Sequence, residues 1–227
     1  MWSRLGKFLW RLAWLALLVP ILLILTLRWI DPPTTSFILQ HDFNAWKSGS
    51  NYAQHSWTDY ENISKDMALA VIAAEDQRFP LHIGLDTKEI SRALQSASQD
   101  RRGASTITQQ TAKNLFLWPA RSYVRKGLEA VMAITMELLL PKQRILEIYL
   151  NIAQTGESMF GVTDAAVTYF KKPPAKLNRF EAARIAATLP NPVKYSATNP
   201  SKHVIDRQRW ILRQMKQLGG TSYLQQL

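Results

Sequence analysis

Hydrophobic and polar positions follow helical spacing over most of the chain. After the first 62 residues, apolar side chains recur every three to four positions, and strand-like alternation is rare. The run MALAVIAAED (67–76) is apolar on all sides, which predicts a buried helix with Ser64 as its N-cap. Thr106 and Gln109 form a capping-box pair that opens a helix to about Leu117. The pattern predicts one mainly α domain.

The C-terminal half continues this helical pattern. The expected helices are 125–140, a helix with Pro141 in its first turn, TDAAVTYF (163–170), a helix capped by Asn178 with Glu181 and ending at LPNP, and the basic amphipathic segment 201–218, closed by Gly219 and Gly220. In 125–140 the apolar stripe consists of Leu128, Val131, Met132, Thr135 and Leu139, and after Pro141 the buried face consists of Ile145, Ile148, Tyr149 and Ile152.

The N-terminal 30 residues differ from the rest. LAWLALLVPILLILTL (12–27) carries no charge, and residues 8–30 are long enough to cross a bilayer if the flanking arginines snorkel. A cleaved signal peptide is the alternative, but RWIDPPT offers no small-x-small cleavage site. The positive-inside rule leaves the N-terminus cytoplasmic, since the run follows Arg4, Lys7 and Arg11. Residues 1–30 are therefore predicted to be a cytoplasmic N-terminus and a single transmembrane anchor.

Residues 31–62 have no clear periodicity. Asp31 to Thr35 contains two prolines and is predicted to be a linker. Residues 36–62 are rich in aromatic side chains, which suit either the core or a surface resting on lipid, and the sequence leaves both open. Residues 63–227 are then expected to form the main folded domain.

The composition narrows the class of partner. The chain has no cysteine, which excludes a disulfide framework and thiol chemistry. Its net charge is +11, which favours an anionic partner such as nucleic acid, acidic lipid or a phosphorylated substrate. Because most of the chain is expected outside the cytoplasm, genomic nucleic acid is the poorest of these.

The positive charge is concentrated between residues 101 and 126, where no Asp or Glu occurs. A solvated face usually mixes signs, so one sign among hydroxyls and amides favours a phosphate site. Lys113 lies one helical turn after Gln109 and two turns after Thr106, so the three share a face that suits a sugar joined to a phosphate. The cations are Arg101, Arg102, Lys113, Arg121, Arg125 and Lys126.

Two carboxylates are candidates for catalysis. Glu75, followed by Asp76, ends the apolar run, where desolvation and the helix dipole disfavour the anion and make it a useful base near neutral pH. The alternative is a solvated helix end. Glu129 is the first acid after the cationic segment. It forms either an ordinary ion pair with Arg125 and Lys126 or a second catalytic carboxylate held among cations.

Two other titratable residues are interpreted as structural. Glu147 has no cluster of charges around it, and His82 lacks the spacing of a metal site and is expected to make a structural hydrogen bond. The sequence contains no glycine-rich phosphate loop and no serine-nucleophile elbow.

Taken together and in order, five segments resemble the motifs of the family 51 glycosyltransferases, the peptidoglycan polymerases. The likeness is to their short class, the monofunctional biosynthetic peptidoglycan transglycosylases. The matching segments are AAEDQRFPLHIG (73–84), GASTITQQTAKN (103–114), RKGLE (125–129), KQRILEIYLNIAQTG (142–156) and RFEAARIAATLPNP (179–192).

The resemblance implies a lysozyme-like, mostly α fold, with lipid II as substrate. The implied reaction is polymerisation into glycan strands with inversion and release of undecaprenyl pyrophosphate, and no transpeptidase domain is expected. Glu75 would be the base that activates the acceptor 4-hydroxyl, and Glu129 the second catalytic carboxylate. Lys113, Arg121 and Lys126 would hold the pyrophosphate.

The resemblance also assigns residues around these groups. The donor cleft would be lined by Ser105, Thr106, Gln109, Gln110 and Asn114, and the supporting residues would be Asp76, Phe79, His82, Gly84 and Glu147. No metal site or resident cofactor is expected, although a divalent cation (Mg²⁺ or Mn²⁺) can accompany the pyrophosphate. The expected partners are lipid II, the growing glycan chain, membrane lipid and other cell-wall synthesis and division proteins, at the bacterial inner membrane with the catalytic domain in the periplasm.

Two alternative functions would share the fold or the membrane anchor but not the polymerisation reaction. A lytic, glycan-cleaving enzyme would share the fold and act on finished wall, without needing a pyrophosphate-sized cationic cluster. A non-catalytic membrane-anchored scaffold of cell-wall synthesis would not need both Glu75 and Glu129.

Overall fold

Helices form almost all of the regular structure. The computed structural model describes residues 2–95, 105–120 and 122–227. In order, the elements are α1 (Trp2–Thr26), α2 (Ser36–Ser48), β1 (Gln54–His55), η1 (Tyr60–Asn62), α3 (Lys65–Glu75), η2 (Phe79–Leu81), α4 (Thr87–Gln95), α5 (Ile107–Phe116), α6 (Tyr123–Leu139), α7 (Lys142–Ile152), β2 (Met159–Phe160), α8 (Val162–Phe170), η3 (Pro174–Lys176), α9 (Arg179–Thr188), α10 (Lys202–Gln217) and η4 (Gly220–Gln226). The prediction of a mainly α chain is confirmed.

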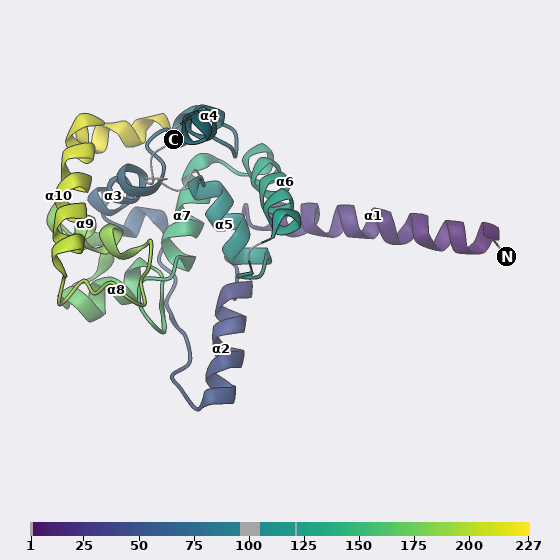
Figure 1. Ribbon diagram of the computed structural model, residues 1–227, viewed down its shortest axis with the longest axis horizontal. Coiled ribbons are helices and arrows are strands. Elements are labelled where there is room, and N and C mark those ends of the chain that lie inside the picture. Colours follow the sequence, from purple (N-terminus) through teal and green to yellow (C-terminus); the bar gives the residue numbers. More distant parts are fainter. Residues whose placement is uncertain (1, 96–104, 121) are drawn as a thin grey trace.

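The core is built around α3 and α7. Every residue from Met67 to Ala73 is buried, and α9, α10 and η4 pack against α3. The predicted face of α7, Ile145, Ile148, Tyr149 and Ile152, is also buried, and α5 packs against this helix (Figure 1). Burial of apolar surface on this scale is the main force that holds the helices together.

The predicted helix caps are mostly confirmed. Both capping boxes form, Thr106 with Gln109 and Asn178 with Glu181. Ser64 occupies the N-cap position of α3, but its hydroxyl donates to the carbonyl of Leu177 at 2.6 Å and does not cap the helix. The tertiary contact replaces the local cap there.

The predicted apolar stripe of α6 is only partly its buried face, since Met132 and Leu139 pack against the core. Leu128 and Val131 are 40% and 61% exposed, whereas Glu129, Ala133 and Met136 are buried. The helix has apolar residues over more than one face, so periodicity alone does not identify the face that meets α5. The partner cations of Glu129 allow the polar side to turn inward.

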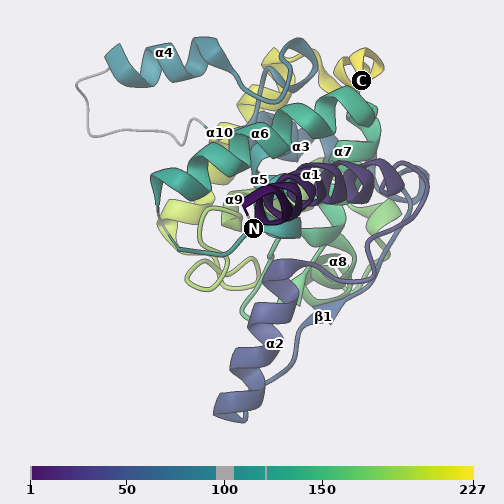
Figure 2. The same ribbon diagram turned by 90° about the vertical axis from the view of Figure 1, so that its right-hand side faces the viewer.

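The helix α1 projects from the body as a long rod, beside α6 (Figures 1 and 2). Its outer part exposes large apolar side chains, whereas Ile24 and Leu27, at the end nearest the body, are 1% and 7% exposed. Within residues 2–95, 105–120 and 122–227, no helix combines the length and the apolar content needed to cross a membrane. The expected span is therefore not confirmed.

Residues 31–62 are built into the body. Pro32 is buried, and Thr35 caps α2 by accepting from the amide of Ile38. β1 pairs in parallel with β2, and Trp57 and Tyr60 pack against the core. The large side chains of this segment that stay exposed are Leu39, Phe43, Trp46 and Tyr52, and their contact with lipid stays a prediction.

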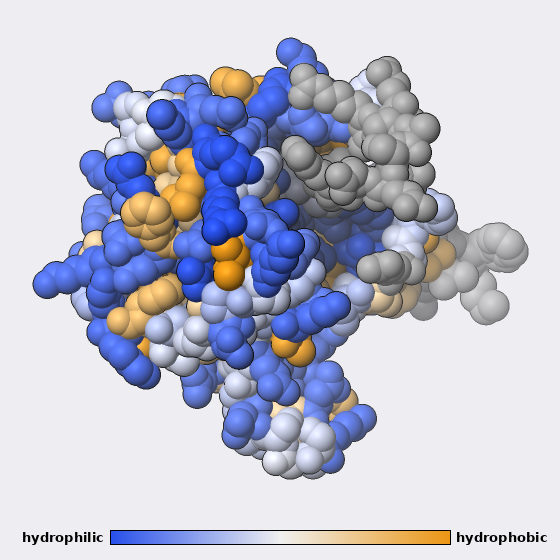
Figure 3. Space-filling view, turned by 60° about the vertical axis from the view of Figure 1, so that its left-hand side comes forward, coloured by the Kyte–Doolittle hydropathy of each residue, from blue (hydrophilic) through white to orange (hydrophobic). Residues whose placement is uncertain are grey.

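The face that carries α9 and α10 differs from the α1 side. It is largely hydrophilic with scattered apolar residues, and it lies away from α1 (Figure 3). The body therefore has an apolar projection on one side and a polar face on the other.

Candidate active site

Glu75 is the last residue of α3 and its side chain is 13% exposed. One carboxylate oxygen accepts a hydrogen bond from the Gln110 amide at 2.9 Å, and the other lies 3.4 Å from the Arg207 guanidinium. Arg207 belongs to α10, which lies outside the five motif segments. The carboxylate predicted as a base is therefore held from two sides, by α5 and by α10.

Gln110 is itself held in position by α7. The Tyr149 hydroxyl donates to the side-chain oxygen of Gln110 at 3.1 Å, so the Gln110 amide nitrogen is directed at Glu75. Burial, together with the charges of Glu75 and Asp76, raises the pKa of Tyr149 well above its usual value. The hydroxyl therefore stays protonated and remains a donor.

Asp76 and His82 form a buried pair behind Glu75. The His82 Nε2 atom lies 2.9 and 3.0 Å from the two Asp76 oxygens, and the backbone amide of Ile107 donates to Asp76 at 3.1 Å. Phe79 is fully buried, with its ring edge-on to His82. This geometry fits the predicted structural hydrogen bond of His82 and attaches the first motif to the start of α5.

Gly84 brings the first-motif loop against α6. Its φ is +71°, and a Cβ built there would lie 2.9 Å from the carbonyl carbon of Ala133 and from the amide nitrogen of Ile134. The Thr106 hydroxyl donates to the Gly84 carbonyl at 2.6 Å. Only glycine fits this close backbone approach.

A buried ion pair that the sequence analysis did not identify supports the same loop. The Lys142 ammonium donates to the carbonyl of His82 and to Glu137, both at 2.7 Å. Glu137 also accepts from the Thr108 hydroxyl at 2.6 Å. The start of α5, the end of α6 and the first-motif loop thus meet at one charge pair.

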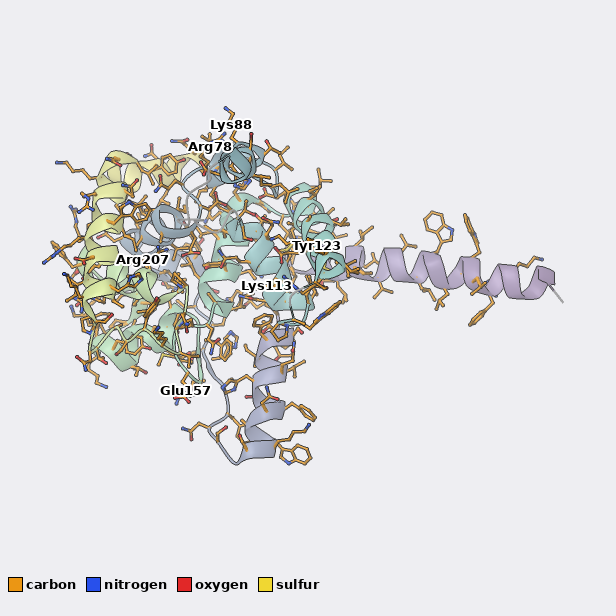
Figure 4. All side chains as sticks on the ribbon, viewed as in Figure 1. Arg78, Lys88, Lys113, Tyr123, Glu157 and Arg207 are labelled. Atoms are coloured by element: carbon orange, nitrogen blue, oxygen red, sulfur yellow. The ribbon has the colours of Figure 1, made fainter. Side chains whose placement is uncertain are left out.

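Lys113 is a half-buried cation on α5. Its ammonium lies 5.2 Å from the centre of the Phe37 ring, and no described carboxylate lies within hydrogen-bond distance of it. Burial lowers the pKa of Lys113, and among its charged neighbours Glu129 and Glu75 oppose that shift. Figure 4 shows Lys113 near α5 and α6, on the side from which α1 projects, and Arg207 towards α10. Lys113 therefore lies in the electrostatic field of both candidate carboxylates, and no ion pair joins it to a carboxylate of the described residues.

Glu129 is buried between cations. Its side chain is 3% exposed and pairs with Arg125 at 2.7 Å and with Lys126. The Lys126 ammonium also donates to the Ser105 hydroxyl at 2.7 Å. Glu129 therefore forms the expected ion pairs with Arg125 and Lys126, but its carboxylate is too deeply buried for these to be ordinary surface pairs.

Part of the expected donor-cleft lining is turned inward. Thr106 and Gln109 are each 2% exposed and bond to each other's backbone, and Asn114 is 8% exposed. The capping box engages the Thr106 hydroxyl and the Gln109 side-chain oxygen, and the face that these residues share with Lys113 stays a prediction. Arg121, also expected at the phosphate, lies outside the described residues, as do Arg101 and Arg102.

Glu147 braces the fold as expected. It accepts from the backbone amide of Tyr60 at 3.1 Å and from Arg144 at 2.9 Å. In the described part of the chain, no group of three or more His, Cys, Asp or Glu residues could hold a metal ion.

The comparisons with known proteins agree with this arrangement. A family model described as Transglycosylase matches residues 42–216. The chain is 51% identical over 198 residues to the biosynthetic peptidoglycan transglycosylase of Cronobacter sakazakii (strain ATCC BAA-894), covering 86% of this chain and 82% of that protein. Proteins of the same name from Escherichia coli O139:H28 and from E. coli K12 are each 51% identical over 199 residues, with the same coverage. The matched region contains Glu75, Lys113, Glu129 and Arg207. Because of the family match and this level of identity, the chain belongs to the transglycosylase family and is a peptidoglycan glycosyltransferase.

Proposed function

We propose that the protein polymerises lipid II into glycan strands, with Glu75 as the general base and Lys113 at the leaving pyrophosphate. The observation that supports this most is the placement of Lys113, a half-buried ammonium without a carboxylate bonded to it among the described residues, coupled electrostatically to both Glu75 and Glu129. A cation in this setting suits a substrate that brings its own negative charge.

The proposed reaction is an inverting glycosyl transfer. Glu75 takes the proton of the acceptor sugar's 4-hydroxyl, whose oxygen attacks the anomeric carbon of the donor. The bond from that carbon to the pyrophosphate oxygen breaks, and the pyrophosphate leaves with the electron pair. An alcohol needs a base at neutral pH, and general base catalysis typically contributes about 100-fold or more.

The cations then compensate the leaving group. Charge grows on the pyrophosphate in the transition state, so a preformed positive site stabilises that state more than the ground state. Lys113 and Arg121 are proposed for this role. Lys126, bonded to Glu129 and Ser105, fits better as the group that fixes the second carboxylate. A divalent cation can arrive with the pyrophosphate as part of the substrate.

The proposed location is the bacterial inner membrane, with α1 inserted and the body in the periplasm. The large side chains on the outer part of α1 are exposed, including Trp10 at 65% and Leu15 at 57%, which is unfavourable in water. α2 runs across the direction of α1 in both ribbon views, and it exposes Leu39, Phe43 and Trp46 on one face (Figures 1 and 2). These three residues would rest on the membrane surface, where aromatic side chains are favoured.

The test is incubation of the full chain with lipid II in vesicles, followed by separation of the glycan products. Long glycan strands support the proposal. Shortened glycan from finished wall, with lipid II untouched, would identify a lytic enzyme. No product from either substrate, while the protein still restores growth of a strain lacking its other polymerases, would identify a scaffold.

A further inference from the structure

The inner end of α1 is fixed to the body at several points. Ile24 and Leu27 lie in the same hydrophobic core as α3 and α7. Arg28, just after the helix, donates to the carbonyl of Leu139 at the end of α6 at 3.3 Å. Only the outer part of the rod in Figure 1 is free of the body. A helix held in this way is expected to leave the body in one direction.

One side chain joins this end of α1 to the rest of the molecule. Arg144, in the first turn of α7, donates from Nε to the carbonyl of Leu27 at 2.7 Å. One of its terminal nitrogens donates to Asp31 at 2.7 Å and the other to Glu147 at 2.9 Å. The guanidinium also lies 5.3 Å from the centre of the Trp57 ring.

This arrangement needs an arginine. The side chain is 13% exposed, and burial opposes its charge, but the bonds to Asp31 and Glu147 outweigh burial and raise the pKa of Arg144. A planar guanidinium can bind three separate acceptors in fixed directions, whereas a lysine ammonium is a point charge on a flexible stem. Arg144 can therefore fix an angle as well as a contact.

The same helix reaches the candidate base. Arg144 lies at the start of α7, and Tyr149, further along it, donates to Gln110, which donates to Glu75. The eleven residues of α7 therefore connect the inner end of α1, through Tyr149 and Gln110, to the candidate base Glu75. A short helix packed in the core is a rigid connection.

We propose that Arg144 is a positioning residue, which holds α1 in one direction relative to the candidate catalytic residues Glu75 and Glu129. The inference rests on the proposed function, in which α1 lies in the membrane that carries lipid II. A substrate confined to a bilayer can be reached only at a set height and angle, so a loosely attached α1 would lower the fraction of productive encounters.

The first measurement is the direction of α1 itself. Since the chain has no cysteine, spin labels can be placed at Leu15→Cys on α1 and Lys202→Cys on α10, both exposed positions. With the full chain in lipid nanodiscs, we expect one narrow distance distribution. Arg144→Gln should broaden it, and Asp31→Asn, which replaces the ion pair of a half-exposed carboxylate with a weaker neutral hydrogen bond, should broaden it less. Arg209→Gln, at an exposed arginine that pairs within its own helix, is the matched control and should change nothing.

The second measurement separates positioning from structure. We expect Arg144→Gln to lower the polymerisation rate on long-chain lipid II in vesicles by about tenfold. A short-chain, water-soluble lipid II analogue reaches Glu75 and Glu129 without the bilayer. On this analogue the rate should stay within about twofold of the wild-type rate, because the substitution leaves these catalytic residues unchanged.

Narrow distributions in both Arg144→Gln and Asp31→Asn would overturn the inference, and so would equal rate losses on the two substrates. If Arg144→Gln fails to fold, Asp31→Asn decides by the same two measurements. If the wild-type chain polymerises neither substrate, the proposed function fails, and the distance distributions alone still decide whether Arg144 fixes α1.

Discussion

Replacing Glu75 with glutamine tests the proposed chemistry most directly. The change is nearly isosteric, and the new amide oxygen can still accept the 2.9 Å hydrogen bond from Gln110. Its amide nitrogen then faces Arg207, and the 3.4 Å charge contact is lost. That contact is long and both partners retain some exposure, so its loss should cost at most about 1 kcal/mol of folding free energy.

The effect on the reaction should be much larger. An amide cannot take the proton of the acceptor hydroxyl, and a lost general base typically costs about 100-fold or more in rate. That factor corresponds to about 2.7 kcal/mol or more of transition-state stabilisation, well above the structural cost. We therefore expect a folded protein that makes almost no polymer.

The assay compares initial polymerisation rates of wild type, Glu75→Gln and Glu157→Gln on one lipid II preparation, with thermal unfolding of each protein. Glu157 is exposed, and Figure 4 shows it apart from Lys113 and Arg207, so its variant should behave as wild type. A Glu75→Gln protein that keeps its Tm and polymerises at more than about a tenth of the wild-type rate would refute the assignment of the base.

Further predictions follow from the same contacts. Gly84→Ala should destabilise the fold by about 2–4 kcal/mol in urea denaturation, through positive-φ strain and overlap with the α6 backbone, and a change below about 0.5 kcal/mol would contradict the close approach. Burial lowers the pKa of Lys113, so its positive charge is present below that pKa and is lost as pH rises through it. The value of kcat/KM should therefore fall at a pH below the usual lysine pKa of about 10.4. Lys113→Arg should remove this alkaline fall, and a variant that keeps it would assign the fall to another group. Tyr149→Phe should cost about 1 kcal/mol of stability and lower kcat more than it raises KM, because the hydrogen bond that orients the Gln110 amide towards the base is lost. Removing the first 20 residues should leave the Tm within a few degrees, whereas removing the first 30 deletes two buried core side chains and should cost about 3 kcal/mol or more by the same measurement.

The sequence by itself determined the features that depend on near neighbours. The buried helix 65–75 and both capping boxes follow from periodicity and from residues three positions apart, and the structure contains them. The motif residues Glu75, Lys113 and Glu129 could be selected because their charges stand out against their own local segments. Short-range patterns of this kind have few alternatives, since the helical repeat fixes which residues share a face.

Tertiary structure alone decided how each face is used. Glu129 turns inward while Val131 turns outward, because the core selects among several apolar faces of α6 and two cations satisfy the buried carboxylate. The Thr106 hydroxyl, expected to line the donor cleft, donates to the Gly84 carbonyl in the first-motif loop. Arg207 and Arg144 reach their partners across more than a hundred residues of sequence, and no local pattern marks a contact of that range. Such contacts form only when the helices pack, so they became visible only in the folded chain.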